Sequence, residues 1–89
     1  MSTYKFWMRG KRLVRLIDST TYDSQDEAHN CCEMTVYKKN AAGGEDYIAS
    51  QNLIDVGSDF FGEYVLKHLG YEQAASWTVP ARLGGTKED

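Results

Sequence analysis

The residues that could bind metal or act as nucleophiles gather in one short stretch, where His29 is followed by Cys31, Cys32 and Glu33. Zinc prefers imidazole and thiolate ligands, and a neighbouring imidazole is also what activates a cysteine nucleophile. Adjacent cysteines, however, lack the Cys-x-x-Cys spacing that lets two thiolates reach one ion. The sequence therefore predicts no metal site and favours the cysteines as small core hydrophobes.

No catalytic motif accompanies these residues. The chain has no Gly-x-Ser-x-Gly nucleophile elbow, no phosphate-binding loop ending in Lys-Ser or Lys-Thr, and no His-Glu-x-x-His sequence. Gly43 and Gly44 lie between two strand-like segments rather than before a helix, where free N–H groups bind phosphate. We therefore expect no catalytic residue and no cofactor, and an enzyme built on a cysteine or on His29 or His68 is the least favoured class.

Charge is segregated along the chain, although the net charge is only −3. Residues 1–17 carry five basic residues and no acid, whereas residues 18–37 carry five acids and no base. This segregation supports two different binding hypotheses, one for each sign of charge.

The basic segment interleaves cations with aromatics, as nucleic-acid surfaces do. Its candidate contacts are Lys5, Trp7, Arg9, Lys11, Arg12 and Arg15. Strand alternation, however, would place Tyr4, Phe6 and Met8 on one face and Lys5, Trp7 and Arg9 on the other, so that one set is core and the other a solvated edge. Because the pI is about 5.3, nucleic-acid binding is the alternative rather than the preferred function.

The acidic residues could present a negative field to a basic groove on another protein, and an aromatic beside them would anchor the contact. Because Phe60 and Phe61 are adjacent, one of them should point away from the core. The candidate partner-binding residues are Asp23, Asp26, Glu27, Glu33, Asp59, Phe60 and Glu63, with Glu45 and Asp46 extending the same patch. The competing interpretation is that these acids are helix caps and an ordinary solubilising surface.

Two β-hairpins are expected. The first joins residues 4–8 to residues 12–17 through a turn at 9–11, and the second joins residues 34–39 to residues 46–51 through Asn-Ala-Ala-Gly-Gly. The polar residues 18–23 read as a connector, and residues 53–57 as irregular.

Two helices are expected as well. Ser24 followed by Glu27 matches a capping box and predicts a helix that fades near Met34. Ser58 or Asp59 caps a second helix that runs to Leu69 before Gly70. Its core stripe would be Phe61, Tyr64, Val65, His68 and Leu69.

These elements predict an α+β domain of ββαββα order, an antiparallel sheet with both helices on one face. A rival interpretation continues the first helix through Tyr37 and leaves a three-stranded sheet. We expect one domain over residues 1–78 and a flexible tail over residues 79–89, where nothing offers a surface to pack.

The chain combines a basic hairpin with acidic helices, and it has a strand at residues 12–17 followed by a capped helix at residues 24–28. It resembles the small accessory proteins of phages and mobile elements, among them the anti-CRISPR inhibitors. The resemblance implies a protein that occupies a binding surface of a host defence complex, such as a nucleic-acid-binding one.

Compartment and assembly follow from composition. Without an apolar run of about 18 residues or a signal sequence, and with only two adjacent cysteines, the chain is expected to be cytoplasmic and not membrane-bound. A monomer and a homodimer are both compatible with the sequence.

Overall fold

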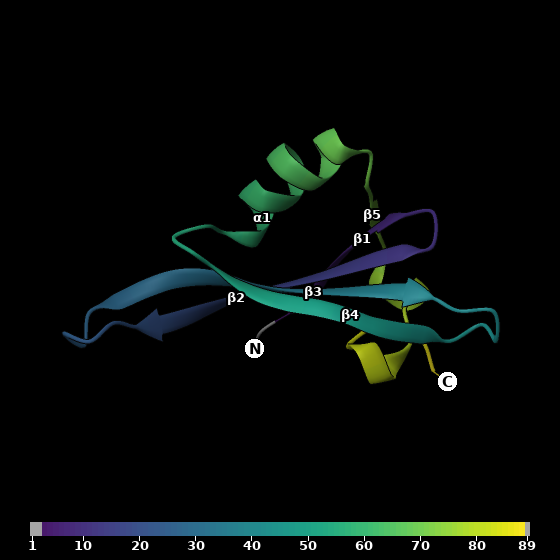
Figure 1. The fold of residues 1–89 in the computed structure, drawn as a ribbon, viewed down its shortest axis with the longest axis horizontal. Coiled ribbons are helices and arrows are strands. Elements are labelled where there is room, and N and C mark those ends of the chain that lie inside the picture. Colours follow the sequence, from purple (N-terminus) through teal and green to yellow (C-terminus); the bar gives the residue numbers. More distant parts are fainter. Residues whose placement is uncertain (1–2, 89) are drawn as a thin grey trace.

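In the computed structural model, which describes residues 3–88, four strands follow one another as antiparallel neighbours before a helix begins. They are β1 (Lys5–Arg9), β2 (Arg12–Tyr22), β3 (Ala28–Lys39) and β4 (Glu45–Ile54). After the helix, β5 (Glu72–Ala74) pairs with β1, so that the sheet order is β4-β3-β2-β1-β5. The molecule is elongated, with extents of 46 × 27 × 22 Å (Figure 1).

The predicted α+β class, the antiparallel sheet and both hairpins are confirmed, but the ββαββα order and the first helix are wrong. Residues 28–39 form a strand, and the expected connector 18–23 is mostly β2. Ser24 and Glu27 belong to a tight turn in which the Asp23 Oδ1 atom accepts the N–H groups of Gln25 and Glu27, at 2.8 and 3.0 Å. The rival three-stranded interpretation is wrong for the same reason.

Pairing with β2 explains why residues 28–33 do not form a helix. Every residue of this stretch lies opposite a residue of β2, from Ala28 opposite Tyr22 to Glu33 opposite Ile17. The long ladder satisfies the backbone and buries Cys31 and Cys32, and this tertiary gain exceeds a local helix preference that is worth only tenths of a kcal/mol per residue.

The sheet is covered on both faces around β1 and β2. On the upper face in Figure 1, the helix packs on Trp7, Val14 and Leu16 of β1 and β2, with Cys32 beside them. On the lower face, Phe6 and Leu13 form a second cluster with residues of the C-terminal segment. The expectation that one side of β1 is a solvated edge is therefore wrong.

The C-terminal segment supplies the second cover. Val79 directly follows a short 3₁₀ turn (Ser76–Thr78), Leu83 ends a second one (Ala81–Leu83), and both are buried in one cluster with Phe6. Residues 79–88 therefore do have a surface to pack on, contrary to the expectation from sequence. Residues 1 and 2 of the expected domain, and residue 89 of the expected tail, lie outside the described residues.

The helix spans residues 58–69, which we call helix 58–69. It starts as α1 (Ser58–Phe61), continues as a π-helical turn (Gly62–Leu66) and ends in a 3₁₀ turn (Lys67–Leu69), with Gly70 in the left-handed conformation at its C-cap. The predicted bounds are confirmed, but the predicted cap is wrong, because Gly57 is the N-cap and makes no side-chain cap hydrogen bond. The predicted core stripe is partly wrong. Leu66 and Gly62 are buried, whereas Tyr64 and Leu69 are exposed.

Candidate functional site

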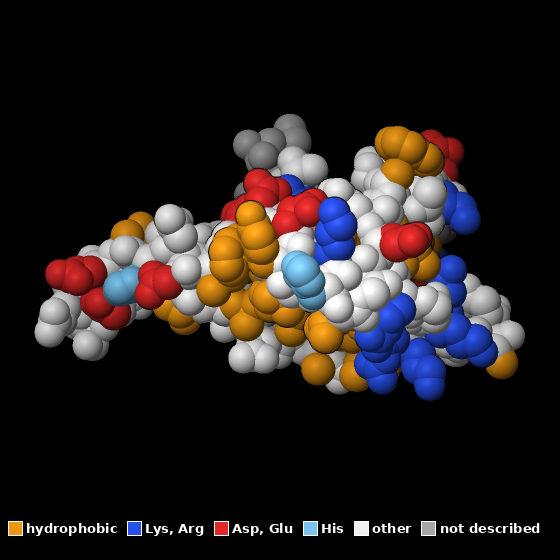
Figure 2. Space-filling view, turned by 90° about the horizontal axis from the view of Figure 1, so that it is seen from above, with side chains coloured by type: hydrophobic (Ala, Val, Ile, Leu, Met, Phe, Trp, Pro, Cys, Tyr) orange, Lys and Arg blue, Asp and Glu red, His pale blue; other side chains and the backbone are white. Residues whose placement is uncertain are grey.

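The outer side of helix 58–69 carries two aromatic rings in contact, tilted by 31° to each other. The centroids of Phe60 and Tyr64 are 4.8 Å apart, and the two residues are 58% and 64% exposed. Asp59 and Glu63 lie on the same helix, and with the two rings they form what we call the helix surface. Figure 2 shows hydrophobic side chains over the helix with acidic side chains next to them.

The start of the helix is fixed by polar contacts to the sheet. Ser58 is buried, and it donates from its backbone N and its Oγ to the Asp18 carboxylate, at 2.7 and 2.6 Å. Lys5 of β1 donates to Ser58 Oγ at 2.9 Å and pairs with Asp59. Burial raises the pKa of Asp18, but the bonds from Ser58 and the charge of Lys5 outweigh it, and the net pKa is lowered. These contacts hold Phe60 in a fixed place on the surface.

The middle of the helix touches the sheet through a glycine. A Cβ atom built on Gly62 would lie 2.6 Å from three indole atoms of Trp7, so that only glycine allows this approach. Trp7 is itself 4% exposed, and its Nε1 atom is the buried side-chain nitrogen without a hydrogen-bond partner among the described residues. Phe61 and Leu66 pack on the same cluster. The outward direction of Phe60 and Tyr64 follows from this docking.

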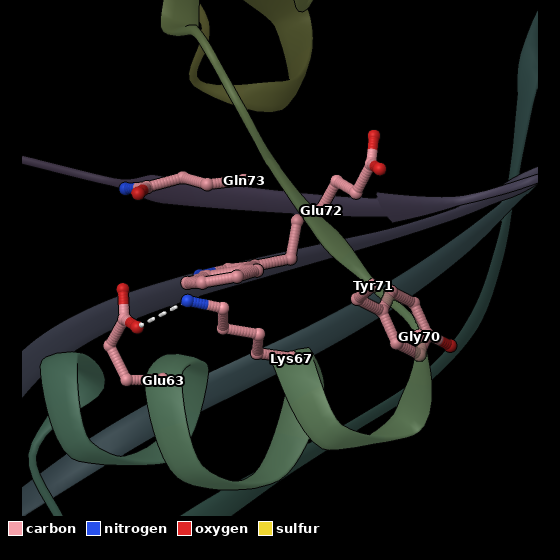
Figure 3. Close-up of a pocket in the computed structure, with 7 residues that line it drawn as sticks. Glu63, Lys67, Gly70, Tyr71, Glu72 and Gln73 are labelled. Carbon is pink, nitrogen blue, oxygen red and sulfur yellow. Dashed lines mark ion pairs between the residues drawn. The ribbon is translucent and has the colours of Figure 1, made fainter.

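A shallow groove of about 450 Å³ lies between helix 58–69 and β5. Figure 3 shows Glu63 and Lys67 paired at 3.6 Å on the helix, facing β5 with Gln73 and Glu72. Tyr71 closes one end beneath Arg9, whose guanidinium lies 4.7 Å from the ring centroid. The Glu63–Lys67 pair lines the helix side of this groove, and Trp7 and Tyr71 supply much of its apolar lining.

The predicted partner-binding acids lie in separate places. Asp23, Asp26 and Glu27 form the turn between β2 and β3, which we call the acidic tip and which projects at the narrow end of the molecule in Figure 2. Glu33 alternates with the core residue Cys32 on β3, so it points to the face opposite the helix. Only Asp59, Phe60 and Glu63 come together, on the helix surface.

The two remaining members of the wider acidic patch lie at the far end of the sheet. The side chain of Glu45 is only 6% exposed and pairs with Arg82, and Asp46 faces Lys38 across the strands. Neither carboxylate adds to the acidic tip or to the helix surface.

His29 stands between two carboxylates beside the acidic tip. Its Nε2 atom is 2.9 Å from Asp23 and its Nδ1 atom 3.3 Å from Asp55, and both partners raise the pKa of His29, with Asp23 the stronger. In return, His29 and the turn N–H groups lower the pKa of Asp23. The ligand atoms of Asp23, Glu27 and His29 lie within 4.8 Å of one another. A divalent cation would fit between them only by displacing the hydrogen bond between His29 and Asp23.

The predicted nucleic-acid contacts are mostly engaged within the fold. Trp7 is buried and offers no face for a base to stack on. Lys5 binds the helix start, Arg9 donates to the Leu69 carbonyl at 2.7 Å, and Arg15 donates to the Leu83 carbonyl at 2.9 Å while lying over Tyr4.

Two of the predicted cations lie together at one end of the sheet. Lys11 and Arg12 are exposed, and Arg12 faces Lys38 across the strands, beside Lys39. We call Lys11, Arg12, Lys38 and Lys39 the basic end.

The cysteines have core environments. Both are free and buried on β3, and burial raises the pKa of Cys32 to about 11. A thiol that stays protonated at neutral pH is a poor nucleophile and a poor metal ligand. His68 lies on the helix, far along the chain from both.

The sequence patterns did not single out Tyr64 as a contact. Its place in a 3.6-residue stripe argued for the core, but the π-helical turn changes the angle between successive residues and turns the ring outward. The neighbouring Phe60–Phe61 pair was the available signal, since one ring of two adjacent aromatics on a helix has to leave the buried face.

Among the described residues, no helix is both long and apolar enough to cross a membrane. Comparison with known protein families, curated proteins and solved structures found no match to this chain.

Proposed function

We propose that this chain is a non-enzymatic protein-binding module whose main contact is the helix surface. The observation that carries the proposal is the contacting pair Phe60 and Tyr64, two exposed rings on a helix anchored at both its start and its middle. Aromatic side chains held rigidly at a surface lose little conformational entropy on binding, and residues of this kind supply much of the energy of protein interfaces.

The chemistry of the partner follows from what surrounds the rings. Asp59 and Glu63 flank them in ion pairs with Lys5 and Lys67 in which both carboxylates stay exposed, and the acidic tip adds negative charge at one end of the same molecule. A partner with an apolar pocket rimmed by basic residues, as in a nucleic-acid-binding protein, complements this surface. If that protein belongs to a host defence complex, the chain acts as a phage-type inhibitor by occupying its binding surface.

Capture of the tagged chain's partners from nuclease-treated bacterial lysate tests the proposal. Phe60→Ala combined with Tyr64→Ala should abolish capture of the partner, because truncating an aromatic anchor typically costs about 2 kcal/mol or more of binding energy. Tyr22→Ala, which removes a similarly exposed ring next to the acidic tip, should leave capture intact. Equal capture by both variants would refute the assignment of the helix surface.

A second candidate function, nucleic-acid binding, is favoured by one feature, the basic end. Arg12, Lys38 and Lys39 lie on the neighbouring strands β2 and β3, Lys11 lies in the turn before β2, and together they could hold phosphates. Retention that disappears after nuclease treatment, or that Arg12→Glu with Lys38→Glu abolishes, would move the function to that surface.

A further inference from the structure

The strand β4 is an edge strand whose outer side meets no other strand among the described residues. It pairs with β3 on one side only and stands last in the sheet order. Eight of its ten residues are exposed, and the other two, Glu45 and Leu53, are half-buried. The N–H and C=O groups on the outer side of such a strand are available to another strand.

The sequence of β4 lacks most of the features that prevent an edge strand from pairing with another chain. From Tyr47 to Ile54 it contains no charged residue and no proline. The opposite edge, β5, is protected by its length of three residues. One protection is present in β4, a bulge at the register shift opposite Val36 and Tyr37, which leaves residues 49–54 as a regular strand.

We propose that β4 pairs antiparallel with β4 of a second copy of this chain, about a two-fold axis at Gln51, to give one continuous sheet. In this arrangement Ala49 lies opposite the second copy's Leu53, and Ser50 lies opposite its Asn52. Such pairs bring small, apolar or neutral polar side chains together and place no like charges face to face. A two-fold axis also makes the interface self-complementary, as closed dimers require.

The charge distribution favours a second copy of the chain as the partner of β4 and favours antiparallel over parallel pairing. The basic end lies where β4 begins, since Glu45 and Asp46 face Lys39 and Lys38, while the acidic tip lies beyond the end of β4. Figure 2 shows the two signs of charge at opposite ends of the molecule. Antiparallel copies set each acidic tip on the same side as the other copy's basic end, whereas parallel copies would bring the two acidic tips together.

Sedimentation equilibrium of the purified chain, with no partner present, tests the proposal separately from the proposed function. The wild type should form dimers, more tightly at low salt. Gln51→Lys should raise the dimer dissociation constant at least about tenfold, because it places two ammonium groups opposite each other at the axis. Gln73→Lys, the same change on an exposed glutamine of the opposite edge strand, should leave it unchanged.

Amide hydrogen exchange on the wild type provides a readout that does not depend on a variant folding. Within residues 49–54, the amides that point away from β3 should be protected at millimolar concentration and exchange freely at high dilution. A wild-type chain that stays monomeric up to millimolar concentration, or outer β4 amides that exchange freely at every concentration, would overturn the proposal. So would a Gln51→Lys chain that dimerises as the wild type does.

Discussion

Gly62→Ala tests how helix 58–69 is held against the sheet. In an unobstructed helix this change is stabilising by about 1 kcal/mol, because alanine has the higher helix propensity. At Gly62 the added methyl group would lie 2.6 Å from the Cε2, Cζ2 and Nε1 atoms of Trp7, well inside van der Waals contact. Overpacking in a filled core costs about 1–3 kcal/mol, and a rigid, buried indole puts this position at the upper end of that range.

The expected net effect is therefore a loss of about 2 kcal/mol in the free energy of unfolding, or roughly 10 °C in Tm for a domain of this size. Urea unfolding followed by Trp fluorescence measures it. Gly57→Ala is the matched control, because a Cβ atom there meets only an Asp18 oxygen, at 3.9 Å, and it should change stability by less than about 1 kcal/mol. Equal stability of the two variants would refute the close contact between the helix and Trp7.

Three further predictions concern titratable and buried groups. The pKa of His29 is raised from 6.5, mainly by its bond to Asp23, so protonated His29 stabilises the fold fully below pH 6.5, and this stabilisation is lost as the pH rises through the folded-state pKa. NMR titration should give a His29 midpoint above 6.5 that falls in Asp23→Asn. A midpoint at or below 6.5 would contradict the contact. Asp18→Ala leaves the buried N–H and hydroxyl of Ser58 without their acceptor and should cost about 1–3 kcal/mol in urea unfolding, so an unchanged urea midpoint would disprove the anchoring role. The Cys32 thiol, with a pKa of about 11 and no exposed surface, should resist iodoacetamide at pH 8 until the chain unfolds, and alkylation of the native protein would show that β3 opens.

Local patterns were enough where the chain's own neighbours decide the structure. Alternating apolar residues around Gly10 predicted the first hairpin, and Gly10 does adopt the positive φ of 57° that a turn uses. Gly70 correctly ended the helix, because a left-handed C-cap depends on the residue that follows the last turn. The start also falls at Ser58 as expected, but it is held by Asp18, forty positions away along the chain, rather than by a local side-chain cap. The exposed Phe60 also followed from sequence, because two adjacent aromatics cannot both face the sheet.

Patterns failed where distant residues decide the structure. The Ser24–Glu27 spacing fits a capping box, yet the backbone there turns through Asp26 at a φ of 58° and enters a strand paired with β2. Val79 and Leu83 look like part of a loose tail until Phe6, more than seventy positions away along the chain, is brought beneath them. The separation of the acidic tip from the helix surface likewise depends on sheet register, which composition does not encode.

The most direct test of the proposed function compares two tyrosines of nearly equal exposure, Tyr64 at 64% and Tyr22 at 66%. A photo-crosslinking amino acid is placed at one position or the other, and the chain is irradiated in nuclease-treated lysate. If the helix surface is the binding surface, position 64 should crosslink to a discrete protein and position 22 should crosslink to none. Crosslinking from position 22 alone would place the contact at the acidic tip and contradict the proposed binding surface.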